Sequence, residues 1–382
     1  MKKIALVAPC NEYNYGTVLQ AYALQRKVEE KGVEAEYLRY TGSLPPSFWK
    51  RSLRRVRDLL RSFRTAKPVY AGKGLDDYSF FRLPEFKPFV DGFERFIQAR
   101  IKMSEVLYDP VSLRACREYD AYMTGSDQTW GRMRFRPRLP YFLENVDAKY
   151  PALSYAPSLG TTHIPQEFME VLAARLPRFS ALSCREKSNC EVLGEKLGRE
   201  VTYVLDPALL LTADAWDTVA APVEDGRLER KQYILCYILG EKACISDFAE
   251  SLGGSKGLPV YYIVTRPLYL GKENHLFATP ESFLSLVRDA DTVVTDSFHG
   301  TVLSIDFNVQ FYGFAKREAG AAVNDNDRIL EFLHTLGLDN RFKADDAASF
   351  DDDIDYTAVN QEVARLRQAS EDYLAATIKQ CL

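Results

Sequence analysis

The sequence predicts an α/β protein with two doubly wound domains that can form a cleft between them. The chain has 382 residues, about twice the usual size of one domain. Short apolar runs alternate with segments of helical apolar spacing, which is typical of parallel sheets with crossover helices. This alternation stops within residues 211–230 and then begins again, so the chain divides into two similar halves.

The first predicted domain covers residues 1–210. It opens with a strand at 3–10, a loop and a helix at 16–30, in which Val18, Leu19, Tyr22 and Ala23 carry the helical spacing. Later apolar runs predict four more strands, near 121–124, 153–156, 181–184 and 201–205. Two helices fall between them, near 166–177 and 186–197.

A segment at 43–109 interrupts this domain and is rich in Arg, Lys, Phe and Pro. It holds no convincing strand, so we predict a helical insertion. Within it, residues 49–64 place apolar side chains on one helix face and seven basic ones elsewhere. Such a helix fits peripheral contact with anionic lipid at the inner face of a membrane, or with a phosphorylated acceptor. A solvated face beside a core stripe explains the same pattern.

The second predicted domain covers residues 211–356. Its strands are expected at 233–239, 260–265, 292–295 and 310–314, and its helices around 244–252, 282–288, 301–305 and 328–336. The last segment, 357–382, repeats apolar residues at Val359, Val363, Leu366 and Tyr373. This stripe predicts a long amphipathic helix that can pack back across the junction of the two domains.

Composition excludes several classes of function. Forty-nine basic and 53 acidic side chains give a net charge of −4, so the chain lacks the basic field of a nucleic-acid-binding protein. Seven cysteines without a C-x-x-C pair predict reduced thiols in a cytoplasmic protein, and four scattered histidines predict no metal site. The apolar start is too short for a signal peptide, and no run approaches a membrane span. The oligomeric state stays open.

Polar residues follow the first strand, at the carboxyl edge where open α/β sheets bind ligands. Asn14, Tyr15 and Gly16 stand here; a glycine permits close approach of the backbone, and amides at a helix start suit an anionic or polar ligand. An ordinary capped turn is the alternative.

A second polar loop follows the strand at 121–124. Ser126, Asp127 and Gln128 can orient sugar hydroxyls, while Trp130 can supply an apolar platform. The alternative is a turn with an Asp cap and a tryptophan in the core.

Three residues are candidates for binding an anion or for transferring a proton. Arg185 ends an apolar strand, where a guanidinium can hold a carboxylate or phosphate in bidentate fashion; a surface salt bridge is the alternative. Ser297 and His299 stand where a later strand gives way to a helix. Ser297 is a candidate residue for binding the anionic ligand, and a histidine there can act as a general acid. A lone histidine is more often structural.

Further cations follow at the same predicted edge. Lys316 and Arg317 come just after the strand at 310–314 and can complete an anion pocket. Arg328 lies close to a predicted helix cap, within a run of Asn and Asp that lacks the glycine of an EF-hand.

Six segments in this order resemble the polysaccharide pyruvyl transferase family. They are 14–22 (NYGTVLQAY), 125–130 (GSDQTW), 185–188 (REKS), 205–207 (LDP), 295–301 (TDSFHGT) and 316–317 (KR). The resemblance covers about residues 3–340 and leaves the insertion and the last helix outside its most recognisable pattern. It implies two facing Rossmann-like domains, similar to the GT-B fold of glycosyltransferases.

The resemblance also implies a reaction. Phosphoenolpyruvate would be the donor, with no separate cofactor, and a free or lipid-linked sugar in an exopolysaccharide or cell-wall glycan precursor would be the acceptor, giving a pyruvate ketal. Such a donor needs cations for its two anionic groups and an acid to protonate its enol carbon. The resemblance makes His299 the acid or a phosphate contact and Arg185 the clamp, with Lys316, or else Arg317 or Arg328, on the phosphate.

Two other functions remain open. A nucleotide-sugar-dependent glycosyltransferase of similar architecture would need acidic residues for the donor ribose, and none is obvious after His299. A non-catalytic polysaccharide-assembly protein on the same scaffold is the other alternative, although intact Arg185 and His299 argue against lost activity.

Overall fold

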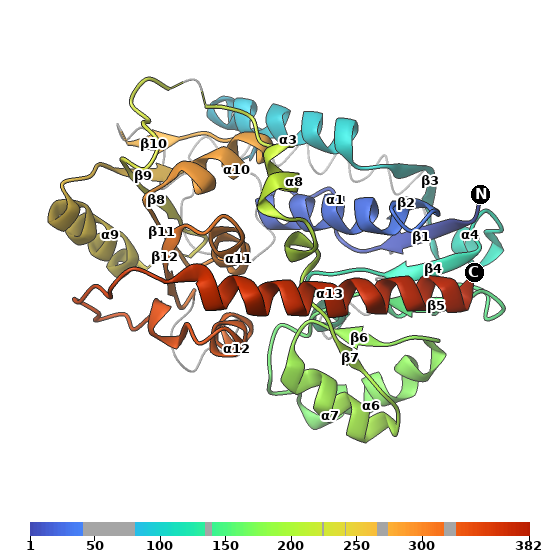
Figure 1. Cartoon of the computed structure of the whole chain (residues 1–382). Helices are drawn as coiled ribbons and strands as arrows, with labels where there is room; N and C mark the ends of the chain where they lie inside the picture. The colour runs from blue at the N-terminus through green and yellow to red at the C-terminus, as the bar shows by residue number, and fades with distance from the viewer. Residues whose placement is uncertain (41–80, 134–139, 224, 241, 266–273, 317–325) are drawn as a thin grey trace, which may run out of the picture.

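Two parallel β-sheets form the centre of the protein (Figure 1). The structure is a computed structural model and describes residues 1–40, 81–133, 140–223, 225–240, 242–265, 274–316 and 326–382. The first sheet has the order β3-β2-β1-β4-β5. Its strands are β1 (Lys3–Val7), β2 (Glu34–Tyr40), β3 (Met103–Tyr108), β4 (Ala121–Thr124) and β5 (Ala152–Ser154). We call the part of the chain around this sheet the first domain.

The second sheet has the order β10-β9-β8-β11-β12-β13. Its strands are β8 (Ile234–Tyr237), β9 (Val260–Ile263), β10 (His275–Leu276), β11 (Thr292–Thr295), β12 (Gln310–Phe314) and β13 (Phe342–Lys343). In each sheet, the strand that comes first in the sequence (β1 or β8) is central. The following strands are added on one side of it and the later ones on the other side, which is the doubly wound Rossmann topology. The predicted fold class is therefore confirmed. We call the part around this sheet the second domain; the exact boundaries at 210 and 356 stay predictions.

Helices connect the parallel strands and cover the sheets. They are α1 (Tyr15–Glu29), α3 (Lys87–Arg100), α4 (Pro110–Ala115), α5 (Thr129–Met133), α6 (Gln166–Arg175), α7 (Lys187–Leu197), α8 (Ala213–Asp217), α9 (Ala243–Lys256), α10 (Pro280–Asp289), α11 (Phe298–Asp306), α12 (Asp327–Thr335) and α13 (Tyr356–Cys381). A small pair of parallel strands, β6 (Ser183–Cys184) and β7 (Thr202–Tyr203), adjoins the first sheet through a bridge between Leu153 and Ala181.

The segment at 43–109 departs from its prediction. It contains the helix α3, but it also supplies β3, so the expectation that it holds no strand is wrong. Because β3 lies at the edge of the sheet, it is buried at only some positions, and its sequence shows no continuous apolar run. The basic stretch 49–64 lies outside the described residues.

The two domains meet through buried aromatic side chains. Tyr15, at the start of α1, stacks on Phe283 of α10 with ring centroids 4.3 Å apart and contacts Tyr237 of β8 edge-on. Its hydroxyl donates to the carbonyl of Ala278, 2.8 Å away. One continuous core therefore includes residues of both sheets.

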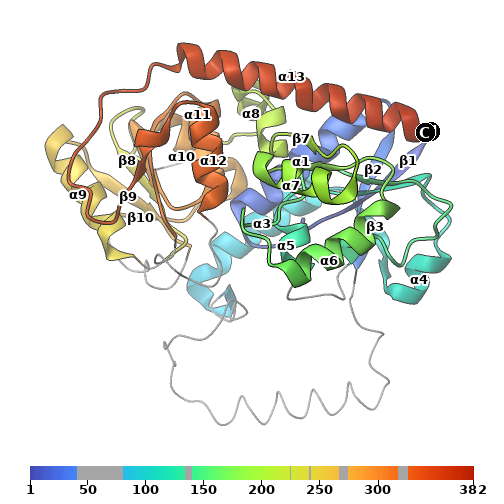
Figure 2. The same ribbon diagram turned by 90° about the horizontal axis from the view of Figure 1, so that it is seen from below.

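The long helix α13 extends over both domains (Figures 1 and 2). In the first domain, the hydroxyl of Tyr373 donates to the carbonyl of Ser154, 3.0 Å away. In the second, Arg367 pairs with Asp306 of α11 at 2.6 Å. The helix thus makes polar contacts with both halves. No helix of the described part of the chain is long and apolar enough to cross a membrane.

Candidate functional site

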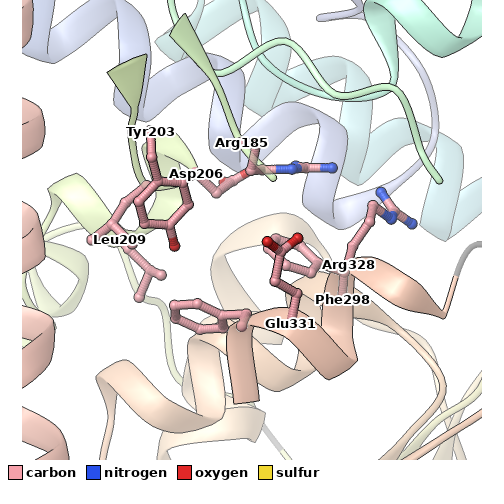
Figure 3. Close-up of a pocket in the computed structure, with 9 residues that line it drawn as sticks. Arg185, Tyr203, Asp206, Leu209, Phe298, Arg328 and Glu331 are labelled. Atoms are coloured by element: carbon pink, nitrogen blue, oxygen red, sulfur yellow. The ribbon is translucent and has the colours of Figure 1, made fainter. Parts of the chain in front are cut away.

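A pocket lies between the domains, beside the first turns of α11 and α12 (Figure 3). It is lined by Arg185, Tyr203, Leu205, Asp206, Leu209, Phe298, Arg328, Glu331 and Phe332. Its free volume is about 320 Å³ when the space open to solvent is counted. Both domains contribute charged side chains to this pocket.

Asp206 connects the polar groups of the site. Its side chain is fully buried, and Oδ2 accepts hydrogen bonds from Nη1 of Arg185 and from Oγ of Ser126, the latter at 3.1 Å. The same oxygen lies 3.6 Å from Nε2 of His299, while Oδ1 accepts from the amide of Ala208 at 2.9 Å. Three candidate residues from separate segments therefore meet at one carboxylate.

The charges around Asp206 explain its ionisation. Burial acts to raise the pKa of this carboxyl, but its electrostatic interactions with His299 and Arg185 outweigh that effect and hold the pKa well below its usual range. The sequence pattern includes Asp206 in the segment 205–207 but indicates no role for it. The sequence signal for Asp206 is a charged residue directly after an apolar run, and the same kind of signal indicates Arg185.

Arg185 has hydrogen-bonding capacity that the protein does not use. Its side chain is 3% exposed, so the alternative of a surface salt bridge is wrong. Nη1 pairs with Asp206, and the guanidinium lies over the ring of Phe298, 4.5 Å from its centroid. Nε and Nη2 are buried without a hydrogen-bond partner. These two nitrogens share one edge of the guanidinium and form a fork suited to a carboxylate or phosphate.

Arg185 keeps its positive charge in this environment. Burial acts to lower the pKa of the guanidinium, but the negative charges of Asp206, Glu186 and Asp127 exceed that effect and leave the pKa above its ordinary value. A permanently charged fork is therefore available to an anionic ligand.

His299 lies in the first turn of α11, which Ser297 caps by accepting from the amide of Gly300 at 3.3 Å. The imidazole packs directly against Gly16 at the start of α1: an ideal Cβ there would lie 2.0 Å from Nδ1 of His299. Nε2, on the Asp206 side, has no hydrogen-bond partner. The N-terminal ends of α1 and α11, from different domains, thus meet at this histidine.

The Gly16 contact leads to a stability prediction. Gly16→Ala is expected to lower the free energy of unfolding by about 1–3 kcal/mol, because the added methyl group overlaps the His299 ring and forces it to move. Gly254→Ala is the matched control, since Gly254 is in α9 with nothing within 4 Å of an added Cβ. That change should stabilise the protein by about 0.5–1 kcal/mol. Urea unfolding of both variants checks this, and equal gains in stability would contradict it.

The loop after β4, which holds the candidate residues for sugar hydroxyls, confirms some expectations and contradicts others. Ser126 reaches the site through Asp206, as described above. Asp127 accepts from Oγ1 of Thr17 at 3.2 Å, which connects this loop to α1, and Gln128 lies next to Gly160. Trp130 is fully buried in the core of the first domain against Phe179, so the proposed apolar platform is wrong and the core alternative is correct.

The turn before α1 is structural in most of its side chains. Asn14 caps α1 by accepting from the amide of Thr17 at 3.1 Å. Tyr15 is 1% exposed and belongs to the core between the domains, so it does not line the cleft as expected. In both Tyr15 and Trp130 the aromatic ring is buried because removing its large apolar surface from water is favourable.

The three candidate cations of the second domain differ in their position relative to the pocket. Arg328 lines the pocket and lies over the Phe298 ring, 5.6 Å from its centroid. Lys316 is absent from the lining, and its amide donates to Oδ1 of Asn326 at 3.1 Å. Arg317 lies outside the described residues. Among the residues that the structure describes, no group of three or more His, Cys, Asp or Glu side chains could hold a metal ion.

Comparisons with known proteins find a matching family model and similar solved structures. The family model described as polysaccharide pyruvyl transferase matches residues 14–316. No curated protein gives a significant match. A solved structure of a putative UDP-N-acetylglucosamine 2-epimerase from Listeria monocytogenes is similar at 13% identity and TM-score 0.47, covering 97% of each chain. The glycosyltransferase SnogD from Streptomyces nogalater is similar at 13% identity and TM-score 0.43, covering 100% of this chain and 99% of its own.

Proposed function

The chain belongs to the polysaccharide pyruvyl transferase family, and from this premise we propose that it transfers the pyruvyl group of phosphoenolpyruvate to a sugar. Two nearby hydroxyls of the acceptor receive the group, which gives a pyruvate ketal and releases phosphate. The acceptor is a sugar of a glycan precursor, either free or linked to a lipid.

One observation carries this proposal: the unused fork of Arg185. Nε and Nη2 are buried and unpartnered, and an unsatisfied buried donor costs about 1–3 kcal/mol, more when it is charged. A carboxylate or phosphate would satisfy both donors at once. Arg328 adds a second positive charge to the same pocket, which favours a ligand with two anionic groups.

The chemistry assigns an acid role to His299. Protonation of the donor's methylene carbon lets one sugar hydroxyl attack the neighbouring carbon; that carbon then loses phosphate and bonds to the second hydroxyl. In total, the carbon takes up one proton, and the two hydroxyls release one proton each. His299 supplies the first proton, and its Nε2 lies 3.6 Å from the carboxylate of Asp206.

The test is direct detection of the product. The protein is incubated with phosphoenolpyruvate and a panel of free and lipid-linked sugars, and the acceptors are examined by mass spectrometry. We expect a product heavier than its acceptor by one pyruvate less one water, with one phosphate released for each ketal. Thermal stabilisation by a nucleotide sugar, without stabilisation by phosphoenolpyruvate and without any ketal, would instead support a glycosyltransferase.

A further inference from the structure

The N-terminus of α7 binds a carboxylate from the other domain. α7 begins at Lys187, two residues after Arg185, and its N-cap residue Glu186 makes no capping hydrogen bond to it. Instead, the amide of Ser188 donates to Oε1 of Glu331 at 2.6 Å, and its hydroxyl donates to Oε2 at 3.2 Å. Glu331 is on α12 of the second domain. The first turn of α7 therefore holds both oxygens of an external carboxylate.

Glu331 also belongs to the pocket of the candidate site. It lines that pocket together with Arg185 and Arg328, and its carboxylate points to the side where both guanidiniums lie (Figure 3). Burial raises the pKa of Glu331 above its ordinary value, although the hydrogen bonds from Ser188 act against this rise. The carboxylate is thus partly desolvated where it lies, which lowers the cost of exchanging it for another anion.

The α7 N-terminus and Arg185 together have the features of an anion site. The N-terminus of α7, a helix of 11 residues, presents amide donors and the positive end of the helix dipole. Arg185 is the independent observation: its buried, unpartnered Nε and Nη2 need an acceptor that the described protein groups do not supply. We propose that Ser188 and the α7 N-terminus bind the carboxylate of the donor, and that Glu331 occupies this subsite in the empty protein and is displaced when the donor enters.

The exchange replaces one carboxylate by another of the same geometry. Ser188 already contacts both oxygens of Glu331, so a ligand carboxylate can take over the same two hydrogen bonds. The donor's phosphate then remains for the Arg185 fork and Arg328. The identity of the ligand rests on the proposed function, whereas the competition between Glu331 and an anion does not. Glu331 therefore acts as an internal competitor that lowers the affinity of the empty site.

The experiment measures binding of phosphoenolpyruvate by isothermal titration calorimetry. Glu331→Ala is expected to bind it about tenfold more tightly than the wild type, because the internal competitor is gone. Asp327→Ala is the matched control: Asp327 lies one turn earlier on α12 and accepts from the amide and hydroxyl of Thr162, at 3.1 and 2.8 Å, across the same junction. The affinity of the Asp327→Ala variant for phosphoenolpyruvate should stay within about twofold of the wild type. If Glu331→Ala fails to fold, Glu331→Gln removes the same charge and should change affinity in the same direction.

A third variant separates displacement from simple repulsion. If Ser188 takes the donor carboxylate, adding Ser188→Ala to Glu331→Ala should remove part of the gain, and a double-mutant cycle measures this coupling. An unchanged affinity in Glu331→Ala, an equal gain in Asp327→Ala or a zero coupling would overturn the proposal. Tighter binding without ketal formation would keep the subsite and refute the proposed function. Ketal formation by the wild type, together with an unchanged affinity in Glu331→Ala, would refute the subsite and keep the proposed function.

Discussion

Replacement of Asp206 by alanine is expected to lower the free energy of unfolding by about 3–5 kcal/mol, the range for breaking a buried ion pair. Arg185 would remain charged, with a side chain that is 3% exposed and has no counter-ion at Nη1. The hydroxyl of Ser126 would lose its acceptor in the same step. Glu170→Ala is the control: it breaks the exposed pair with Lys196 and should cost no more than about 1 kcal/mol. Urea unfolding at neutral pH measures both.

The pH dependence of this difference identifies its cause. The folded protein lowers the pKa of Asp206, so the stabilisation is present above the ordinary pKa of an aspartate, about 3.9, and is lost as the pH falls below it. The gap in stability between wild type and Asp206→Ala should therefore narrow as the pH falls below about 4. A gap that is absent at neutral pH, or that widens as the pH falls below about 4, would show that the carboxylate does not stabilise Arg185.

The sheets were predictable from the sequence because their inner strands are continuous apolar runs. β4, β8 and β11 are buried along their whole lengths, and runs of this kind between helical segments indicate parallel strands. β2 and β3 lack this signal, since charged residues alternate with buried ones in β2 and β3 lies at the sheet edge. Their sequences resemble connecting segments as much as strands.

The site was predictable in position but not in its contacts. Arg185 and His299 both follow apolar strands, so the sequence indicated that they lie at carboxyl edges. Their meeting at Asp206 depends on how one domain packs against the other, which no local pattern records. The same holds for the contact of Gly16 with His299 and of Glu331 with Ser188. These contacts join the two domains.

Substitution of His299 by glutamine is expected to have the largest effect on activity, lowering phosphate release in the presence of acceptor about 10²–10⁴-fold. Glutamine retains a polar side chain beside Asp206 but cannot deliver a proton as an imidazolium can. His334→Gln is the matched control, because that side chain is 81% exposed at the end of α12 and pairs with the exposed Asp339 at 3.0 Å. Its rate should equal that of the wild type.

The kinetic parameters of His299→Gln distinguish the two roles open to this residue. A general acid acts in the transition state, so its loss lowers kcat and kcat/KM together, whereas a residue that only contacts bound phosphate raises KM and leaves kcat unchanged. We expect the first pattern, because Nε2 lies at the pocket carboxylate, 3.6 Å from Oδ2 of Asp206, and has no hydrogen-bond partner among the described residues, so it is available to a bound donor. Wild-type kcat in a variant that unfolds at the wild-type urea concentration would remove His299 from the chemistry. The Arg185 fork would then be left as a binding group for the donor.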